Sequence, residues 1–243
     1  MKAENGNSDT EWLDKQIAAI QRKKHPTICS LVKTRDQIQK LRIATANRMD
    51  AMERVNLDCL ETAIAAHGLI CSGLVEMEDE IAGEWEKEVK EHPLWIEWLS
   101  QVKGIGLTTT GNLIGLIDDV GRFDTISKLW AYVGLRPDDK KKKGEAASWD
   151  HELKAFLLGT VFPGLMRAKG SYYDLYHRIR ENYDEKHPDK TDGHRHNMAR
   201  RKVMKLFLSH LYQTWREIEG LPVRDPYPIE QQQHTTQIMP LIG

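Results

Sequence analysis

The stretch that decides the fold runs from Leu99 to Ile117 and has the sequence LSQVKGIGLTTTGNLIGLI. It begins as a helix, is interrupted by Gly104-Ile105-Gly106, and continues as a second helix that opens at Leu107 or Thr108. Glycine adopts backbone angles that a side chain forbids, so the two glycines predict a tight turn between two helices. Ile105 is placed to anchor this turn in a core, and Thr108 or a neighbour is placed to cap the second helix.

The same turn is typical of a site for nucleic-acid backbone. The amides at the start of a helix point outward and carry the positive end of the helix dipole, which favours a phosphate oxygen. Glycine lets the backbone approach such a ligand closely. The candidate DNA-binding residues of this helix-hairpin-helix are Lys103, Gly104, Ile105, Gly106 and Thr108. The motif would grip the backbone without recognising base sequence, and a tight turn with no ligand is the alternative interpretation.

Composition places the chain among ordinary globular proteins. Its 243 residues are 40% hydrophobic, 29% charged and 7% aromatic, which predicts an apolar core and argues against wholesale disorder. The three widely spaced cysteines argue against a disulfide scaffold and against a cysteine-built zinc site, so we expect no metal and no cofactor. No apolar stretch reaches the ~20 residues of a membrane span, and residues 1–10 are too polar for a signal peptide. The expected location is the cytoplasm, with no membrane partner.

Charge is balanced overall, with a formal net charge of -1, but it is sorted along the chain. Residues 76–91 are strongly acidic, whereas residues 138–143 and 194–205 are basic. Sorted charge can form a basic face on a neutral protein. The candidate phosphate contacts outside the turn are Lys140, Lys141, Lys142, Lys143, Arg200, Arg201 and Lys205. A solvated lysine loop and an ordinary amphipathic helix are the alternatives.

The first part of the chain predicts long helices. Residues 28–85 contain no proline, and apolar or small residues recur at spacings of about seven and of three or four, at Leu31, Ile38, Leu41, Thr45, Met52, Val55, Cys59 and Ala66. This spacing is typical of a long amphipathic helix or a coiled coil. We expect a break between Gly68 and Gly73. Two interpretations stay open: two antiparallel helices packed within one chain, or a coiled coil that makes a homodimer.

A domain boundary is expected at His92-Pro93, because the residue before proline resists helical angles. The predicted fold class is all-α, with a long-helix or coiled-coil front followed by a compact helix-hairpin-helix domain. The predicted parts are a polar segment over residues 1–27, the long helices over 28–92, the compact domain over 93–220 and a proline-containing extended tail over 221–243. The tail is expected to lie over the domain surface or to reach a partner.

The order of motifs resembles a known family. Gly104-Ile105-Gly106 is followed by Arg-Phe-Asp-Thr-x-x-x-Leu-Trp-Ala-Tyr-Val-Gly-Leu-x-Pro over residues 122–137, and then by a late basic helix over 196–215. This string resembles the carboxy-terminal domain of the insertion-sequence 110/116/902 group of transposases. The resemblance extends from about Trp98 to Glu219.

The resemblance implies a DNA-joining enzyme made of several parts. Members of the group carry a RuvC-like nuclease half with four metal-binding acidic residues, then a coiled coil, then this domain, and some are guided by a structured RNA. Residues 1–27 are too short for a RuvC-like sheet, so we expect that half to be absent here. The expected partners are DNA, with structured RNA as the alternative, a second copy of the chain through the front helices, and a separate RuvC-like nuclease chain.

The resemblance also implies a serine nucleophile in the loop after Pro137. Ser148 is the only hydroxyl residue of the loop 138–148 and is therefore the candidate catalytic residue. Neighbouring cations would lower the cost of its alkoxide. Because Ser148 lies just before the next helix, capping of that helix is the alternative. The sequence thus predicts a DNA-binding protein related to a transposase, with a serine-dependent recombinase subunit or a coiled-coil interaction protein as the alternatives.

Overall fold

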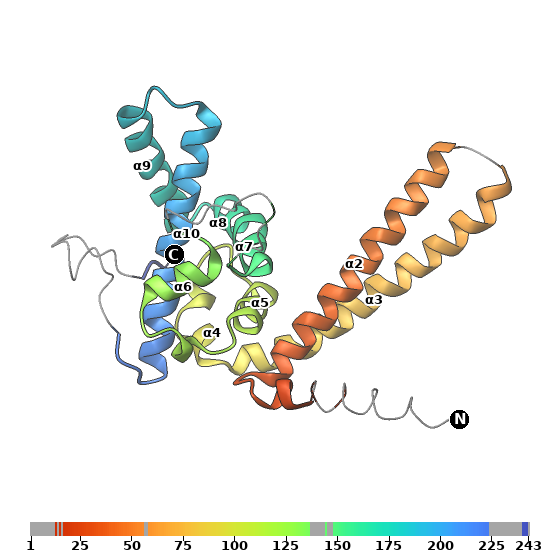
Figure 1. Ribbon diagram of the computed structural model, residues 1–243, viewed down its shortest axis with the longest axis horizontal. Helices are drawn as coiled ribbons and strands as arrows, with labels where there is room; N and C mark the ends of the chain where they lie inside the picture. The colour runs from red at the N-terminus through yellow and green to blue at the C-terminus, as the bar shows by residue number, and fades with distance from the viewer. Residues whose placement is uncertain are drawn as a thin grey trace. The chain divides into compact units, whose positions relative to one another are not determined.

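The structure is a computed structural model, and it describes residues 13, 15, 17–55, 58–136, 144, 148–223 and 240–242. Within these ranges the chain forms helices and turns and no strand, which confirms the all-α fold class. The chain divides into two units, whose helices are labelled in Figure 1. The first unit contains residues 1–89 and 114–118, and the second contains residues 90–113 and 119–243.

The first unit is built on two long helices, α2 (Pro26–Val55) and α3 (Glu61–Glu91), which lie side by side (Figure 1). A single turn of 3-10 helix at Asp58–Leu60 precedes α3. The expected break between Gly68 and Gly73 is therefore wrong, since both glycines lie inside α3. A glycine costs a helix only about 1 kcal/mol, and packing along a long helix outweighs that cost.

Contacts between α2 and α3 show that the two helices are antiparallel. Arg42 donates from Nε to Oε1 of Glu78 at 2.5 Å. Arg35 lies about two turns before Arg42 in α2. Its guanidinium is 5.8 Å from the ring centroid of Trp85, which lies about two turns after Glu78 in α3. Glu78 is buried, so one member of the acidic stretch 76–91 serves as an internal ion-pair partner. Packing of two antiparallel helices within one chain is thus observed.

The start of α2 is held by Asp118, which follows the last turn of α5 (Leu107–Ile117) and belongs to the first unit. Asp118 Oδ1 accepts hydrogen bonds from the amides of Lys24 at 3.1 Å and His25 at 3.2 Å, and from the Cys29 thiol at 3.2 Å. Lys23 Nζ lies 3.3 Å from Oδ2. A carboxylate from a distant segment therefore fixes the residues that lead into α2, and its charge lies near the positive end of that helix.

The second unit is arranged around α10 (Asp192–Ile218), the late basic helix expected from the sequence. It packs against α9 (Ser171–Lys186), α4 (Pro93–Glu97) and α6 (Ile126–Val133). The core face of α10 consists of Ala199, Val203, Met204, Phe207, Leu208, Leu211, Tyr212 and Trp215, all buried. Because this apolar face is enclosed, α10 presents its basic residues to the flanks.

Helices α7 (His151–Phe156) and α8 (Phe162–Ala168) are joined by a π-helical turn at Leu157–Val161. The amide of Phe162 donates to the carbonyl of Leu157, five residues back. The next amide in this pattern would come from Pro163, which has no N–H. No backbone N–H inside the helix is therefore placed to donate to the carbonyl of Leu158.

Candidate nucleic-acid interface

The predicted turn lies between a 3-10 turn at Leu99–Gln101 and α5, which begins at Leu107 as expected. The first helix is shorter than predicted, because α4 ends at Glu97 and Trp98 leaves helical geometry. Ile105 is only 7% exposed, and its amide donates to the carbonyl of Val102 at 3.1 Å. Ile105 therefore anchors the turn in the core, as the sequence predicted.

Gly104 is fixed by the packing of the turn on α8. Its φ of +93° is a conformation that side chains disfavour. A Cβ built on Gly104 would lie 2.5 Å from the carbonyl oxygen of Gly164, and a Cβ on Gly164 would lie 2.8 Å from the carbonyl oxygen of Gly104. The two backbones meet where neither residue has room for a side chain. This contact gives Gly104 a structural role in the turn.

Gly106 has a different environment. It is exposed, and a Cβ there would meet no atom within 4 Å. Its carbonyl accepts the first bond of α5, from the amide of Thr110 at 2.9 Å, so Gly106 occupies the cap position. Thr108 lies inside the first turn and is not the cap. The first amides of α5 have no acceptor within the helix, and Lys103 is exposed beside them in the sequence.

The predicted cations Arg201 and Lys205 contact the second unit itself. Arg201 Nη2 donates to the carbonyls of Gly134 at 3.2 Å and Arg136 at 2.9 Å. Lys154 Nζ donates to the same Gly134 carbonyl at 2.8 Å. Gly134 ends α6 in the left-handed conformation, with φ of 71°, so two cations cap the carboxyl end of that helix. Lys205 Nζ lies 3.9 Å from the ring centroid of Trp130.

Arg200 is bound to the π-helical turn. Its Nη2 donates to the carbonyl of Leu158 at 2.6 Å, which is the carbonyl that Pro163 leaves without a helical donor. Arg200, Arg201 and Lys205 are all half-buried, whereas Lys202 on the same helix is exposed. The sequence pattern located these cations on one helix. It gave no sign that three of them hold neighbouring segments of the second unit.

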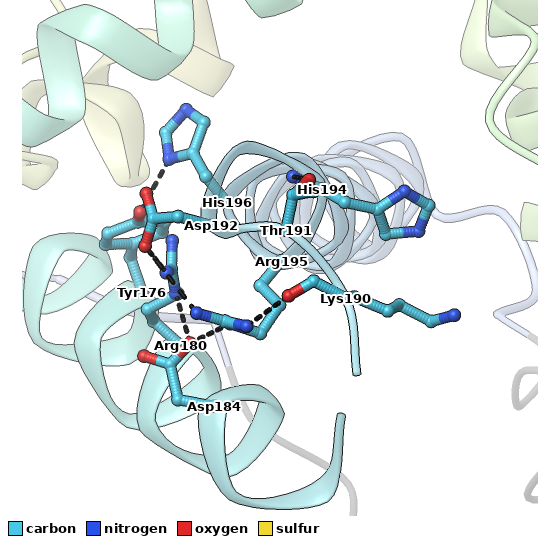
Figure 2. A network of polar contacts seen from close by, with 9 residues as sticks. All are labelled: Tyr176, Arg180, Asp184, Lys190, Thr191, Asp192, His194, Arg195 and His196. Carbon is cyan, nitrogen blue, oxygen red and sulfur yellow. Dashed lines mark hydrogen bonds and ion pairs between the residues drawn. The ribbon is translucent and has the colours of Figure 1, made fainter. Parts of the chain in front are cut away.

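The junction of α9 and α10 carries a polar network that the sequence did not suggest (Figure 2). Asp184 Oδ1 accepts from Arg180 Nε at 2.9 Å and from Arg195 Nε at 2.5 Å. Arg180 also pairs with Asp192, and Arg195 donates to the carbonyl of Lys190. Burial would raise the pKa of Asp184, but the hydrogen bonds from the two arginines outweigh it and hold that pKa below its usual range. The network balances charge between two helices.

Ser148 is exposed, and it does not cap the next helix. Asp150 takes that position, since its Oδ1 accepts from the amide of Leu153 at 2.8 Å. The capping interpretation of Ser148 is therefore wrong, because a better capping residue lies two positions later. Trp149 packs against Gly134 and has Lys154 Nζ 4.3 Å from its ring centroid. Lys140, Lys141, Lys142 and Lys143 lie outside the described residues.

Histidines of the second unit are engaged with tyrosines. Tyr176 Oη lies 2.7 Å from His196 Nδ1, and Tyr172 Oη lies 2.6 Å from His210 Nδ1. In the described part of the chain, no three His, Cys, Asp or Glu side chains gather in a way that could hold a metal ion. The described helices also include none with the length and apolar character needed to cross a membrane.

The comparisons with known proteins place one segment of the chain in a family. Residues 96–144 match the family model described as Transposase IS116/IS110/IS902 family. No curated protein and no solved structure matches the chain. The matched segment contains the turn, α5 and α6, and the resemblance of residues 145–219 stays a prediction. Over residues 96–144 the chain is thus similar to the transposases of the IS116/IS110/IS902 group.

Proposed function

We propose that this chain is a DNA-binding protein that grips the nucleic-acid backbone through the turn at residues 103–108. One observation carries the proposal: the two glycines of the turn have separate environments. A side chain on Gly104 would meet the backbone of Gly164, whereas a Cβ on Gly106, at the start of α5, would meet no atom within 4 Å. Glycine suits the cap position that Gly106 occupies, and it also leaves room for a phosphate to approach the first amides of α5.

Two further features support this proposal. Lys103 is exposed next to the turn and adds a positive charge to the dipole of α5. The turn also lies within the segment that matches a family of DNA-transposing enzymes. Contacts of this kind are made to phosphate and sugar, so the turn would position the protein on DNA without selecting a base sequence.

The experiment is a gel-shift titration of Gly106→Val on a duplex of arbitrary sequence. The space around Gly106 accommodates the side chain, so the variant is expected to keep its helix content and to lose affinity, because the added methyls hold a phosphate away from the amides. Loss of one or two charge-assisted bonds predicts a drop of about 10-fold or more. Gly83→Val is the matched control, since Gly83 is an exposed helical glycine of the first unit. Equal affinity of the Gly106→Val and Gly83→Val variants would show that the turn is not the contact.

A serine-dependent recombinase subunit is the second candidate, and the environment of Ser148 favours it. Ser148 is exposed, and Asp150, not Ser148, caps the following helix. Its neighbour Trp149 lies against Lys154, whose charge is also directed at Gly134. A nucleophilic serine needs cations near its hydroxyl, and in the sequence Ser148 lies between the lysines at 140–143 and Lys154. The nuclease half of such an enzyme would come from another chain.

Ser148→Ala on labelled supercoiled DNA separates the two candidates. A DNA-binding protein without serine chemistry keeps its affinity when Ser148 is replaced and forms no covalent adduct with DNA in either form. A recombinase subunit keeps its affinity but loses the covalent protein–DNA adduct, which is detected on a denaturing gel. If no adduct forms with the unaltered chain, with and without a RuvC-like partner, the serine mechanism is excluded.

We further propose that two copies associate through the front helices, α2 and α3. The support is a set of large apolar side chains that the first unit leaves exposed: Leu41, Ile43, Val55, Leu69, Ile70, Val75 and Met77. Where such side chains gather on one face of a helix pair, they are typical of a protein–protein interface.

A further inference from the structure

The carboxy-terminal residues Pro240–Ile242 lie on the second unit, far along the chain from the segments that they contact. Trp98 Nε1 donates to the carbonyl of Leu241 at 3.2 Å. Ser171 Oγ donates to the carbonyl of Ile242 at 2.7 Å. The backbone of Leu241 also acts on the Tyr172 hydroxyl and lowers its pKa, against the larger effect of burial. Two side chains of the unit thus bind the main chain of two consecutive residues, and a third lies beside them.

The side chains that bind this segment are held in place by the core. Trp98 and Tyr172 are 3% and 2% exposed, and both rings pack on Phe207, with centroids 5.8 Å and 5.5 Å away. Tyr172 Oη lies 2.6 Å from His210 Nδ1, which fixes the orientation of the hydroxyl. Burial keeps the pKa of Tyr172 well above its ordinary value, so the hydroxyl stays protonated. The binding groups are therefore preorganised.

We propose that the surface formed by Trp98 and by Ser171 and Tyr172 of α9 is a docking site for an extended apolar peptide, and that the chain's own segment Pro240–Ile242 is the ligand that occupies it. Main-chain hydrogen bonds to rigid side chains are the contacts by which proteins bind short peptides. Pro240 restricts the backbone before Leu241, which reduces the entropy lost on docking. Leu241 is half-buried, whereas Ile242 is 55% exposed, so Leu241 is the side chain that selects the ligand.

The test uses the full chain and a fluorescein-labelled peptide of residues 236–243, TQIMPLIG. Leu241→Asp places a charge on the half-buried side chain and should release the chain's own segment, which leaves the site open. Ile242→Asp is the matched control, because the exposed side chain tolerates a charge. In fluorescence anisotropy the peptide should bind Leu241→Asp at least about 10-fold more tightly than it binds the unaltered chain or Ile242→Asp, since a covalently attached ligand competes at high effective concentration.

A second set of variants checks where the peptide binds. Adding Ser171→Ala or Trp98→Phe to Leu241→Asp should weaken peptide binding by about 2- to 10-fold each, the effect of losing one hydrogen bond. Adding Ser100→Ala, an exposed serine of the same unit, should leave it unchanged. Equal peptide binding by Leu241→Asp and the unaltered chain, or no binding by either, would overturn the proposal. So would a dimer that is lost in Leu241→Asp, because the segment would then dock on a second copy.

Discussion

At the scale of single residues, the two glycines of the turn are subject to different structural requirements. Position 104 needs glycine for its backbone angle and for the carbonyl of Gly164, whereas position 106 needs neither. The sequence predicted the turn but treated the two glycines alike. It could not distinguish them, because the residue that encloses Gly104 lies on a helix 60 positions later in the chain.

The first prediction follows from that difference. Gly104→Ala should lower the free energy of unfolding by about 2 kcal/mol or more, because it adds left-handed strain and a clash with Gly164. Gly106→Ala should change it by less than about 0.5 kcal/mol. Urea unfolding followed by circular dichroism measures both. Similar values for the two variants would contradict the packing described for the turn.

The second prediction concerns the thiol of Cys29. Burial, together with the hydrogen bond to Asp118, raises its pKa from 9.0 to about 12. The folded state therefore keeps a proton that the unfolded state releases, and the stability that this provides is complete below pH 9 and is lost as the pH rises toward 12. At pH 9, iodoacetamide should label the exposed Cys59 first and leave Cys29 unmodified, as judged by mass spectrometry. Asp118→Asn should accelerate labelling of Cys29, and early labelling of Cys29 in the unaltered chain would refute this account.

At the scale of helices, the sequence predicted that a helix is present more reliably than it predicted where the helix begins or ends. It identified the late helix α10 and the start of α5 at Leu107, because these features depend on neighbouring residues. It misplaced the break between α2 and α3, since helix-internal glycines look like a boundary. The π-helical turn and the Arg200 contact were not predicted, because the contact joins α10 to a segment 42 residues earlier in the chain.

The third prediction concerns association through α2. The recurring apolar or small residues of α2 differ in exposure. Thr45 is buried and Leu31, Ile38 and Met52 are half-buried, whereas Leu41 and Val55 are more than half exposed. Replacing both Leu41 and Val55 by lysine should therefore yield a monomer in analytical ultracentrifugation with an unchanged helical signal. Gln37→Lys and Asp50→Lys, at exposed positions of the same helix, form the matched control. A monomeric unaltered chain at tens of micromolar would show that the front helices do not dimerise.

At the scale of the whole molecule, the number of Lys and Arg residues in the basic stretches overestimates the number of cations that are free to bind DNA. Several arginines of the second unit bind carbonyls or carboxylates of their own unit, and Glu78 in the first unit is likewise internal. The cations available to DNA are thus fewer than the basic stretches suggest. Exposed Lys103 and Lys202 are the better candidates among the described residues.

The fourth prediction concerns salt. Each phosphate that the protein neutralises contributes about -0.9 to the slope of log affinity against log salt. Lys103→Ala should therefore flatten the slope by about one unit and weaken all DNA sequences alike. Replacing Lys140, Lys141, Lys142 and Lys143 together by alanine should flatten it by about one to two units. Arg200→Gln should leave the slope unchanged, because its charge is directed at Leu158. If only Arg200→Gln flattens the slope, the DNA-binding surface lies on α10 and not at the turn.

The contact between Gly104 and Gly164 also sets an order on the making of the protein. A ribosome releases the turn many residues before it releases α8, so the newly made turn has no surface to pack against until residue 164 has emerged. The segment that matches the transposase family ends at residue 144, before that surface exists. A fragment restricted to this segment would therefore lack the backbone of α8 against which Gly104 packs.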